Sequence, residues 1–196
     1  ELVRGNKMKK IILVHGWDGS PKEPMHQWIK KQAESLEYHA VVPEMPNPAL
    51  PEINAWVSHL TKIAGRIDEE TIFIGHSIGC QAVLRYMETL PKNVKIDRCI
   101  LIAPWMKLDE ETIKEEGEEV VAIAKPWMET SINWEKVKSH CRDFICIFSD
   151  NDPYVLLANK DIFRVELNAK AIVLKNRYHF DFGNNINNLP EILQFI

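Results

Sequence analysis

Short apolar runs recur along the chain, and segments with helical spacing of apolar residues separate them. We predict strands over residues 10–16, 39–45, 71–75, 98–104, 143–149 and 170–176. Most of these runs are continuously apolar, as in "IILV" and "CILIA", and do not alternate with polar residues. Continuous runs are typical of strands that are covered on both faces, as in a parallel sheet. The pattern therefore predicts buried, parallel strands.

The intervening segments predict helices. The clearest helix begins after Ser77, where apolar residues fall on one face as far as Leu90, and Pro91 marks its end. Further helices are predicted over roughly 24–37, 51–66, 131–141, 155–167 and the C-terminal "LPEILQFI". Alternating strands and helices predict an α/β fold, a three-layer α/β/α sandwich with right-handed crossovers. Because no repeat or low-complexity linker interrupts the alternation, we expect a single domain over residues 1–196.

Residues 104–130 interrupt this regular alternation. They join two predicted strands by a longer path and contain an acidic run from Leu108 to Glu119. Long connections in such folds tend to be functional, so a small cap or lid is one interpretation. A helix that is anchored to the core by its apolar residues is the other, and the sequence favours neither.

Composition narrows the class of protein. The 196 residues are 45% apolar and 27% charged, with a net charge of −4, so the basic excess of a nucleic-acid-binding protein is absent. The longest apolar runs are far shorter than the roughly 20 residues of a membrane span. We therefore expect a soluble, cytoplasmic protein without a signal peptide that binds neither nucleic acid nor membrane. Met8 is a candidate native start, which would leave residues 1–7 foreign to the natural chain.

The cysteines and histidines give no sign of a metal site. Cys80, Cys99, Cys141 and Cys146 show no CxxC spacing, and each lies beside apolar residues. Reduced, buried thiols are therefore favoured over disulfides or a zinc site. The histidines form no HxH or HExxH motif. We expect neither a metal nor an organic cofactor.

The strongest chemical signal is the segment "GHSIG" at residues 75–79, which matches the pattern G-x-S-x-G. A chance match occurs in roughly one chain of this length in twenty, so its context matters. The segment follows a predicted strand and opens a predicted helix, as a nucleophile elbow does, and Gly75 and Gly79 would let strand and helix approach. We interpret Ser77 as a nucleophile; a serine that only caps the helix is the alternative.

A serine nucleophile needs a base, and the base needs an orienting group. In elbow enzymes an acid and then a histidine follow the serine, each at the end of a later strand. His179 follows the last predicted strand, and Asp150 and Asp152 follow the one before it. We favour Asp152 because it precedes Pro153, where the chain turns, whereas Asp150 suits a turn or a helix cap. The "DND" segment lacks the glycine and terminal glutamate of a calcium-binding loop, which argues against calcium.

Two backbone N–H groups should stabilise the oxyanion. We assign these to Ile78, at the start of the helix, and to Trp17, in the loop after the first strand. His76 lies inside the elbow, and we expect it to pack beneath the turn. The candidate substrate-pocket residues are Trp105, Trp127, Met128, Tyr154 and Phe180. Residues of this kind also suit a core or an interface.

Several segments together carry a family resemblance: "VHGWDGS", "PNP", "TIFIGHSIGCQAVLRYMETL", "KPWMETSINWEKVKSHC", "SDNDPYV" and "YHF". Over most of its length the chain resembles the retinoblastoma-binding protein nine and YdeN-like family of small α/β-hydrolases. The resemblance implies a reduced hydrolase core with six mainly parallel strands in the order 2-1-3-4-5-6, and serine hydrolase activity. It also implies binding of retinoblastoma protein by some relatives through an LxCxE motif. This chain has no LxCxE motif, so we do not transfer that function.

The leading hypothesis is a serine hydrolase that cleaves a small carboxylic ester or related acyl compound through an acyl-enzyme. An amidase or peptidase, or an acyltransferase, would use the same triad. The third alternative is a non-catalytic protein-binding module on a hydrolase scaffold. The ordered set Ser77, Asp152 and His179 argues against this last alternative. The expected partner is a small-molecule acyl substrate, and no protein partner is indicated.

Overall fold

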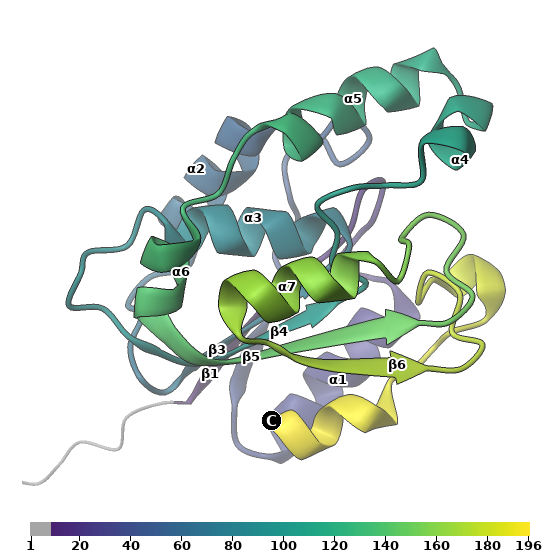
Figure 1. Cartoon of the computed structure of the whole chain (residues 1–196). Coiled ribbons are helices and arrows are strands. Elements are labelled where there is room, and N and C mark those ends of the chain that lie inside the picture. The colour runs from purple at the N-terminus through teal and green to yellow at the C-terminus, as the bar shows by residue number, and fades with distance from the viewer. Residues whose placement is uncertain (1–8) are drawn as a thin grey trace, which may run out of the picture.

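A six-stranded sheet forms the central layer of the protein (Figure 1). The computed structural model describes residues 9–196, so the candidate start at Met8 and the seven residues before it lie outside the described residues. The strand order is β2-β1-β3-β4-β5-β6, and every neighbouring pair is parallel. The predicted sheet order is confirmed.

All predicted strands are present, with shifted ends. They are β1 (Lys10–Val14), β2 (His39–Val41), β3 (Thr71–His76), β4 (Ile96–Ile102), β5 (Cys141–Ser149) and β6 (Lys170–Leu174). In β1, Ile11 and Leu13 pack into one core, whereas Ile12 and Val14 pack into the other. Because both faces of the inner strands are covered, their sequences are apolar at consecutive positions.

Helices cover both faces of the sheet and complete the predicted three-layer sandwich (Figure 1). They are α1 (Pro24–Ser35), α2 (Ile53–Ile63), α3 (Ile78–Met87), α4 (Glu110–Glu115), α5 (Glu118–Glu129), α6 (Trp134–His140), α7 (Asn159–Leu167) and the 3-10 helices η1 (Phe182–Asn184) and η2 (Pro190–Phe195). Helices α1 and η2 pack on one face, and α2, α3, α6 and α7 pack on the other. Within residues 9–196 no helix combines the length and apolar character that a membrane crossing requires.

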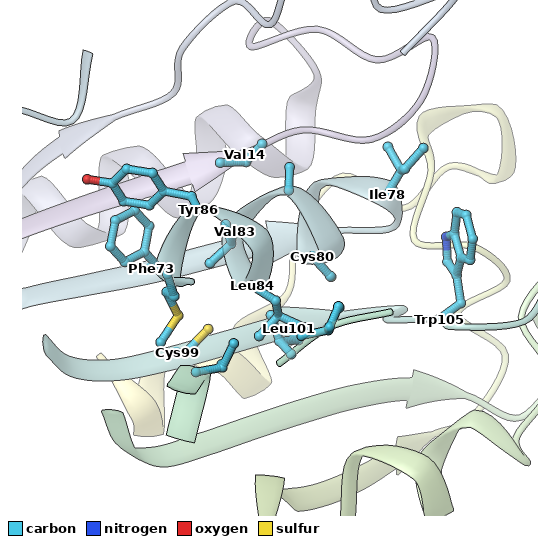
Figure 2. Close-up of a cluster of buried hydrophobic side chains, with 14 of the residues drawn as sticks. Val14, Phe73, Ile78, Cys80, Val83, Leu84, Tyr86, Cys99, Leu101 and Trp105 are labelled. Carbon is cyan, nitrogen blue, oxygen red and sulfur yellow. The ribbon is translucent and has the colours of Figure 1, made fainter. Parts of the chain in front are cut away.

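Helix α3 lies against the centre of the sheet and positions the residue before it, Ser77. All ten residues of α3 are buried. Figure 2 shows Val83 and Leu84 of α3 in the cluster that also contains Phe73 of β3 and Leu101 of β4. Each fully buried side chain of this size contributes about 2 kcal/mol to stability. The start of α3 is therefore a rigid platform.

Residues 104–130 contain α4 and α5, which are separated by Gly117. Asp109 caps α4 by accepting a hydrogen bond from Thr112 N at 3.1 Å. Ile113 and Trp127 are buried and anchor the two helices to the core, while the acidic side chains between these residues are exposed. The segment is thus an anchored helical connection, and its role as a lid stays a prediction.

The four cysteines are free and buried, as the sequence predicted. They are Cys80, Cys99, Cys141 and Cys146. Burial raises the pKa of each thiol, so all four are protonated at neutral pH and poor metal ligands.

Candidate active site

Ser77 lies at a sharp turn between β3 and α3. Its backbone angles are φ 53° and ψ −123°, a conformation that residues with a side chain rarely adopt. A Cβ atom at Gly79 would lie 2.5 Å from His15 O, and one at Gly75 would lie 2.6 Å from Cys80 Cα. Real Cβ atoms do not approach so closely, so only glycine fits at either position. The turn has the strand–turn–helix geometry of a nucleophile elbow.

Three side chains from three strand ends form a continuous hydrogen-bonded chain. Ser77 Oγ lies 2.9 Å from His179 Nε2, and His179 Nδ1 lies 2.8 Å from Asp152 Oδ2. When Nδ1–H donates to the carboxylate, Nε2 carries the lone pair that can accept the serine proton. The side chain of Asp152 is only 2% exposed, which shields this contact from water.

Asp152, and not Asp150, faces the histidine. Asp152 Oδ1 accepts hydrogen bonds from Tyr154 N at 2.9 Å and Val155 N at 3.0 Å, which turns Oδ2 toward the imidazole. Asp150 is exposed, and its Oδ1 accepts a hydrogen bond from Asn176 N at 2.8 Å. It stabilises the loop after β6, in line with the structural role considered for it.

Two side chains at the end of β5 hold the loop that carries the histidine. Asn151 Oδ1 accepts hydrogen bonds from Tyr178 N at 2.9 Å and from Ser149 Oγ at 2.8 Å. Ser149 Oγ in turn accepts one from Arg177 N at 3.0 Å. The sequence interpretation missed both side chains. The only available signal was the position of Asn151 between the two aspartates.

The loop after β1 brings the Trp17 backbone toward Ser77. A Cβ atom on Gly16 would lie 3.3 Å from Ser77 Cβ, so the loop touches the elbow. The Trp17 indole donates a hydrogen bond to Ala49 O at 3.1 Å and anchors the loop. Within residues 9–196, no acceptor pairs with the backbone N–H of Trp17 or with that of Ile78. Both amides are therefore available to a ligand.

A cavity of about 1050 Å³ opens above Ser77 and His179. Trp105 and Tyr154, two of the predicted pocket residues, line it. Further residues line the cavity from four segments. These are the loop between β1 and α1 (Trp17, Asp18, Glu23), the loop after β2 (Ala49, Leu50), residues 104–130, here called the α4–α5 segment (Leu108, Ile113, Glu116, Glu119, Val120, Ile123), and the loop after His179 (Asp181, Phe182).

The other three predicted pocket residues do not line this cavity. Trp127 is 1% exposed, and its indole donates to Pro51 O at 2.9 Å. Phe180 is fully buried in the core on the α1 face of the sheet. Met128 packs against the core on the α3 face. Their large apolar side chains fill the two cores, a use that sequence could not distinguish from lining a pocket.

The Trp105 side chain also contacts Ser77. Its Nε1–H donates to Ser77 Oγ at 3.3 Å. Its backbone oxygen accepts a hydrogen bond from Gln81 Nε2 at 2.9 Å, and Gln81 Oε1 accepts one from Arg85 at 2.9 Å. This buried polar network fixes the indole against α3.

Two buried histidines, His76 and His26, lie behind His179. His76 Nε2 is 2.9 Å from the backbone oxygen of His179, and His76 Nδ1 is 3.2 Å from His26 Nε2. His76 is buried beneath the elbow, as predicted, while the contact with His26 was not foreseen. Burial lowers the pKa of His26 to about 4 and holds the pKa of His76 well below its ordinary value. Both imidazoles are therefore neutral at pH 7.

Comparison with known proteins agrees with this geometry. A family model described as serine hydrolase matches residues 11–196. Serine hydrolase RBBP9 of Rattus norvegicus is 28% identical over 172 residues, which cover 86% of this chain and 80% of that protein. YdeN of Bacillus subtilis (strain 168) is 22% identical over 182 residues, with coverage of 93% and 91%.

Solved structures extend the likeness to the fold. The crystal structure of the B. subtilis ydeN gene product matches with a TM-score of 0.84 over 96% of each chain, at 22% identity. A structure from a study of carboxylesterases of the thaumarchaeon Nitrososphaera gargenis matches with a TM-score of 0.70, at 15% identity and coverage of 96% and 88%. The predicted α/β-hydrolase resemblance is confirmed. Because the family model spans nearly all of the sequence, the chain belongs to the serine hydrolase family.

Proposed function

We propose that the protein hydrolyses a small carboxylic ester or related acyl substrate through a covalent acyl-enzyme on Ser77. The observation that carries this proposal is the unbroken chain of hydrogen bonds, 2.9 Å from Ser77 Oγ to His179 Nε2 and 2.8 Å from His179 Nδ1 to Asp152 Oδ2. A hydroxyl whose proton can pass to an oriented imidazole is an activated nucleophile.

In the first half of the reaction, Ser77 Oγ attacks the carbonyl carbon while His179 Nε2 takes the hydroxyl proton. Negative charge develops on the carbonyl oxygen, where the backbone N–H groups of Trp17 and Ile78 would stabilise it. The carbon–oxygen bond to the leaving alcohol then breaks, and His179 gives that alcohol its proton. Asp152 stabilises the imidazolium in between.

In the second half, water replaces the alcohol. His179 takes a proton from water, whose oxygen attacks the acyl carbon. The bond to Ser77 Oγ breaks, the carboxylic acid leaves, and Ser77 recovers its proton from the imidazolium. No group outside the chain and the water is needed to balance the reaction.

The apolar part of the cavity wall favours a substrate with an apolar portion. Trp17, Leu50, Trp105 and Tyr154 offer apolar surface next to Ser77. The carboxylesterase fold match from N. gargenis supports an ester as the substrate. Four free, buried cysteines favour a reducing compartment, so we place the reaction in the cytoplasm.

A panel of 4-nitrophenyl esters of increasing acyl length, with the matching 4-nitroanilides, tests the proposal. We expect saturable ester hydrolysis by the wild type and a loss of at least about 10³-fold in Ser77→Ala. The exposed Ser58 of α2 supplies a matched control, and Ser58→Ala should keep full activity.

Other outcomes would redirect the proposal. Faster turnover of the anilides would indicate an amidase, and acyl transfer to an added alcohol in preference to water would indicate an acyltransferase. Wild-type protein that turns over none of these substrates would contradict the proposal and favour a binding module.

A further inference from the structure

A cluster of two buried histidines and one half-buried glutamate behind the triad contains side chains that hydrolysis does not use. Ligand-type atoms of Glu23, His26 and His76 all lie within 4.8 Å of one another. Glu23 is the N-cap residue of α1, His26 lies three residues later on that helix, and His76 ends β3. His26 is 0% exposed and His76 is 3% exposed.

A hydrogen bond to a carbonyl oxygen fixes which ring nitrogen of His76 carries the proton. His76 Nε2 lies 2.9 Å from His179 O, which can only accept, so Nε2 carries the hydrogen and Nδ1 keeps its lone pair. This lone pair faces His26 Nε2 at 3.2 Å, and His26 Nδ1 lies 3.2 Å from Ser20 O. Neutral His26 has one N–H, which it donates either to His76 Nδ1 or to Ser20 O. With the hydrogen on Nδ1, the facing nitrogens of both histidines can bind one cation.

The spacing of these two facing nitrogens suits a metal ion. Ligand atoms of tetrahedral Zn²⁺ with bonds of about 2.0–2.1 Å are about 3.3 Å apart. The 3.2 Å between His76 Nδ1 and His26 Nε2 is close to that value. Glu23 adds a carboxylate, and two histidines with one carboxylate are an established ligand set for zinc.

The partners outside the cluster are also those of a metal site. Histidine ligands usually donate their second N–H to a backbone carbonyl or a carboxylate, which fixes the ring and raises its basicity. Here Ser20 O and His179 O take these positions. Glu23 and His76 also line the cavity above Ser77, which provides a path for an ion to enter.

We propose that Glu23, His26 and His76 form a site for a divalent transition metal such as Zn²⁺, with a fourth coordination position toward the cavity. The only local sequence signal is the Glu-x-x-His spacing at residues 23–26. His76 lies 50 residues from His26, so motifs of short spacing could not reveal the site. The site adjoins the triad, because its ligand His76 donates to the backbone oxygen of His179.

Metal titration of the full chain, after dialysis against a chelator, tests the site. We expect calorimetry to show one equivalent of Zn²⁺ bound, and Co²⁺ to give the strong visible absorption of a four-coordinate site that Zn²⁺ abolishes. Glu23→Gln and His26→Gln should each weaken Zn²⁺ binding by more than about tenfold. Even the mutation of a residue that only hydrogen-bonds to a metal ligand typically weakens metal binding by that much. The control His39→Ala removes an exposed histidine of β2 and should bind as the wild type does.

The Glu23→Gln variant keeps the test decisive if the replacement of buried His26 disturbs folding. Glu23 is partly exposed, and a glutamine there can still accept the hydrogen bond that Ser20 N donates at 2.9 Å. Three results overturn the proposal: wild-type protein without saturable one-to-one binding, Glu23→Gln with wild-type affinity, or an equal loss in His39→Ala. Calorimetry does not depend on hydrolysis, so this test and that of the proposed function fail independently.

Discussion

Asp150 and Asp152 are two residues apart, yet their carboxylates have different partners. Asp152 contacts His179 at 2.8 Å, whereas Asp150 accepts from Asn176 N. We expect Asp152→Asn to lower kcat by about 10⁴-fold, because a carboxamide cannot stabilise the imidazolium and favours the wrong tautomer. Asp150→Asn should retain activity, because its carbonyl oxygen can still accept from Asn176. Ester hydrolysis by both variants checks this, and the reverse ranking would assign the acid to Asp150.

At this scale the sequence predicted which side chains the fold brings together at the candidate site. The order along the chain is that expected of an elbow enzyme, with Ser77, Asp152 and His179 each following a strand. The position of Asp152 directly before Pro153 was the reason to choose it over Asp150. The roles of Asn151 and Ser149 were not predictable, because their partners lie in the loop after β6 and only folding brings the two loops together.

The junction between β3 and α3 depends on close packing against β1. A Cβ atom at Gly79 would collide with the backbone oxygens of Val14 and His15, neither of which can move aside as a side chain can. We expect Gly79→Ala to lower the free energy of unfolding by about 3 kcal/mol and to displace Ser77. Urea unfolding and ester hydrolysis measure the two effects.

An exposed glycine whose one close neighbour is a side chain provides the control for the stability measurement. Gly183 lies in η1, is exposed, and a Cβ there would meet only the Asp181 side chain, at 3.0 Å. Gly183→Ala should change stability by less than about 0.5 kcal/mol. A Gly79→Ala protein as stable as Gly183→Ala would contradict the steric argument.

The elements themselves were largely predictable, because burial on both faces leaves a clear pattern in the strands. The differences lie at the ends. Strand β2 stops at Val41 instead of reaching residue 45, and Pro43 has no N–H to continue the ladder. The "LPEILQFI" segment forms a 3-10 helix. Residues 104–130, for which a cap or an anchored helix was considered, contain the two helices α4 and α5.

For the molecule as a whole, buried neutral histidines make stability depend on pH. Burial lowers the pKa of His15, His26 and His76 in the folded protein. The unfolded chain takes up protons on these residues near pH 6.5, and the folded chain does so only at lower pH. The contribution of these neutral histidines to the free energy of unfolding is therefore complete above about pH 6.5. It is lost as the pH falls, by up to about 1.4 kcal/mol per pH unit for each histidine.

Urea unfolding of the chelator-treated protein at pH 7, 6 and 5 measures this effect. We expect the free energy of unfolding to fall at each step. The raised pKa of Glu23 acts in the opposite sense, but it is a single group. His39→Ala, which removes an exposed histidine, should give the same slope as the wild type. Stability that is constant or rises from pH 7 to pH 5 would contradict the account.

The cavity is formed by the molecule as a whole, and it was the feature that the sequence predicted least well. Its walls come from the loop after β1, the α4–α5 segment and the loop after His179, which are distant in sequence. An aromatic residue such as Phe180 has the same sequence signature in a core as in a pocket. The cluster of Glu23, His26 and His76 likewise exists only once α1 packs beside the end of β3.

The central claim is that Ser77 is an activated nucleophile, and labelling with a fluorophosphonate tests it most directly. Such a probe forms a stable bond with the hydroxyl oxygen of an activated serine. Intact-mass measurement followed by peptide mapping should show one adduct on Ser77 in the wild type and none in Ser77→Ala. Wild-type protein that stays unlabelled while a known serine hydrolase reacts, or labelling that persists in Ser77→Ala, would contradict the claim.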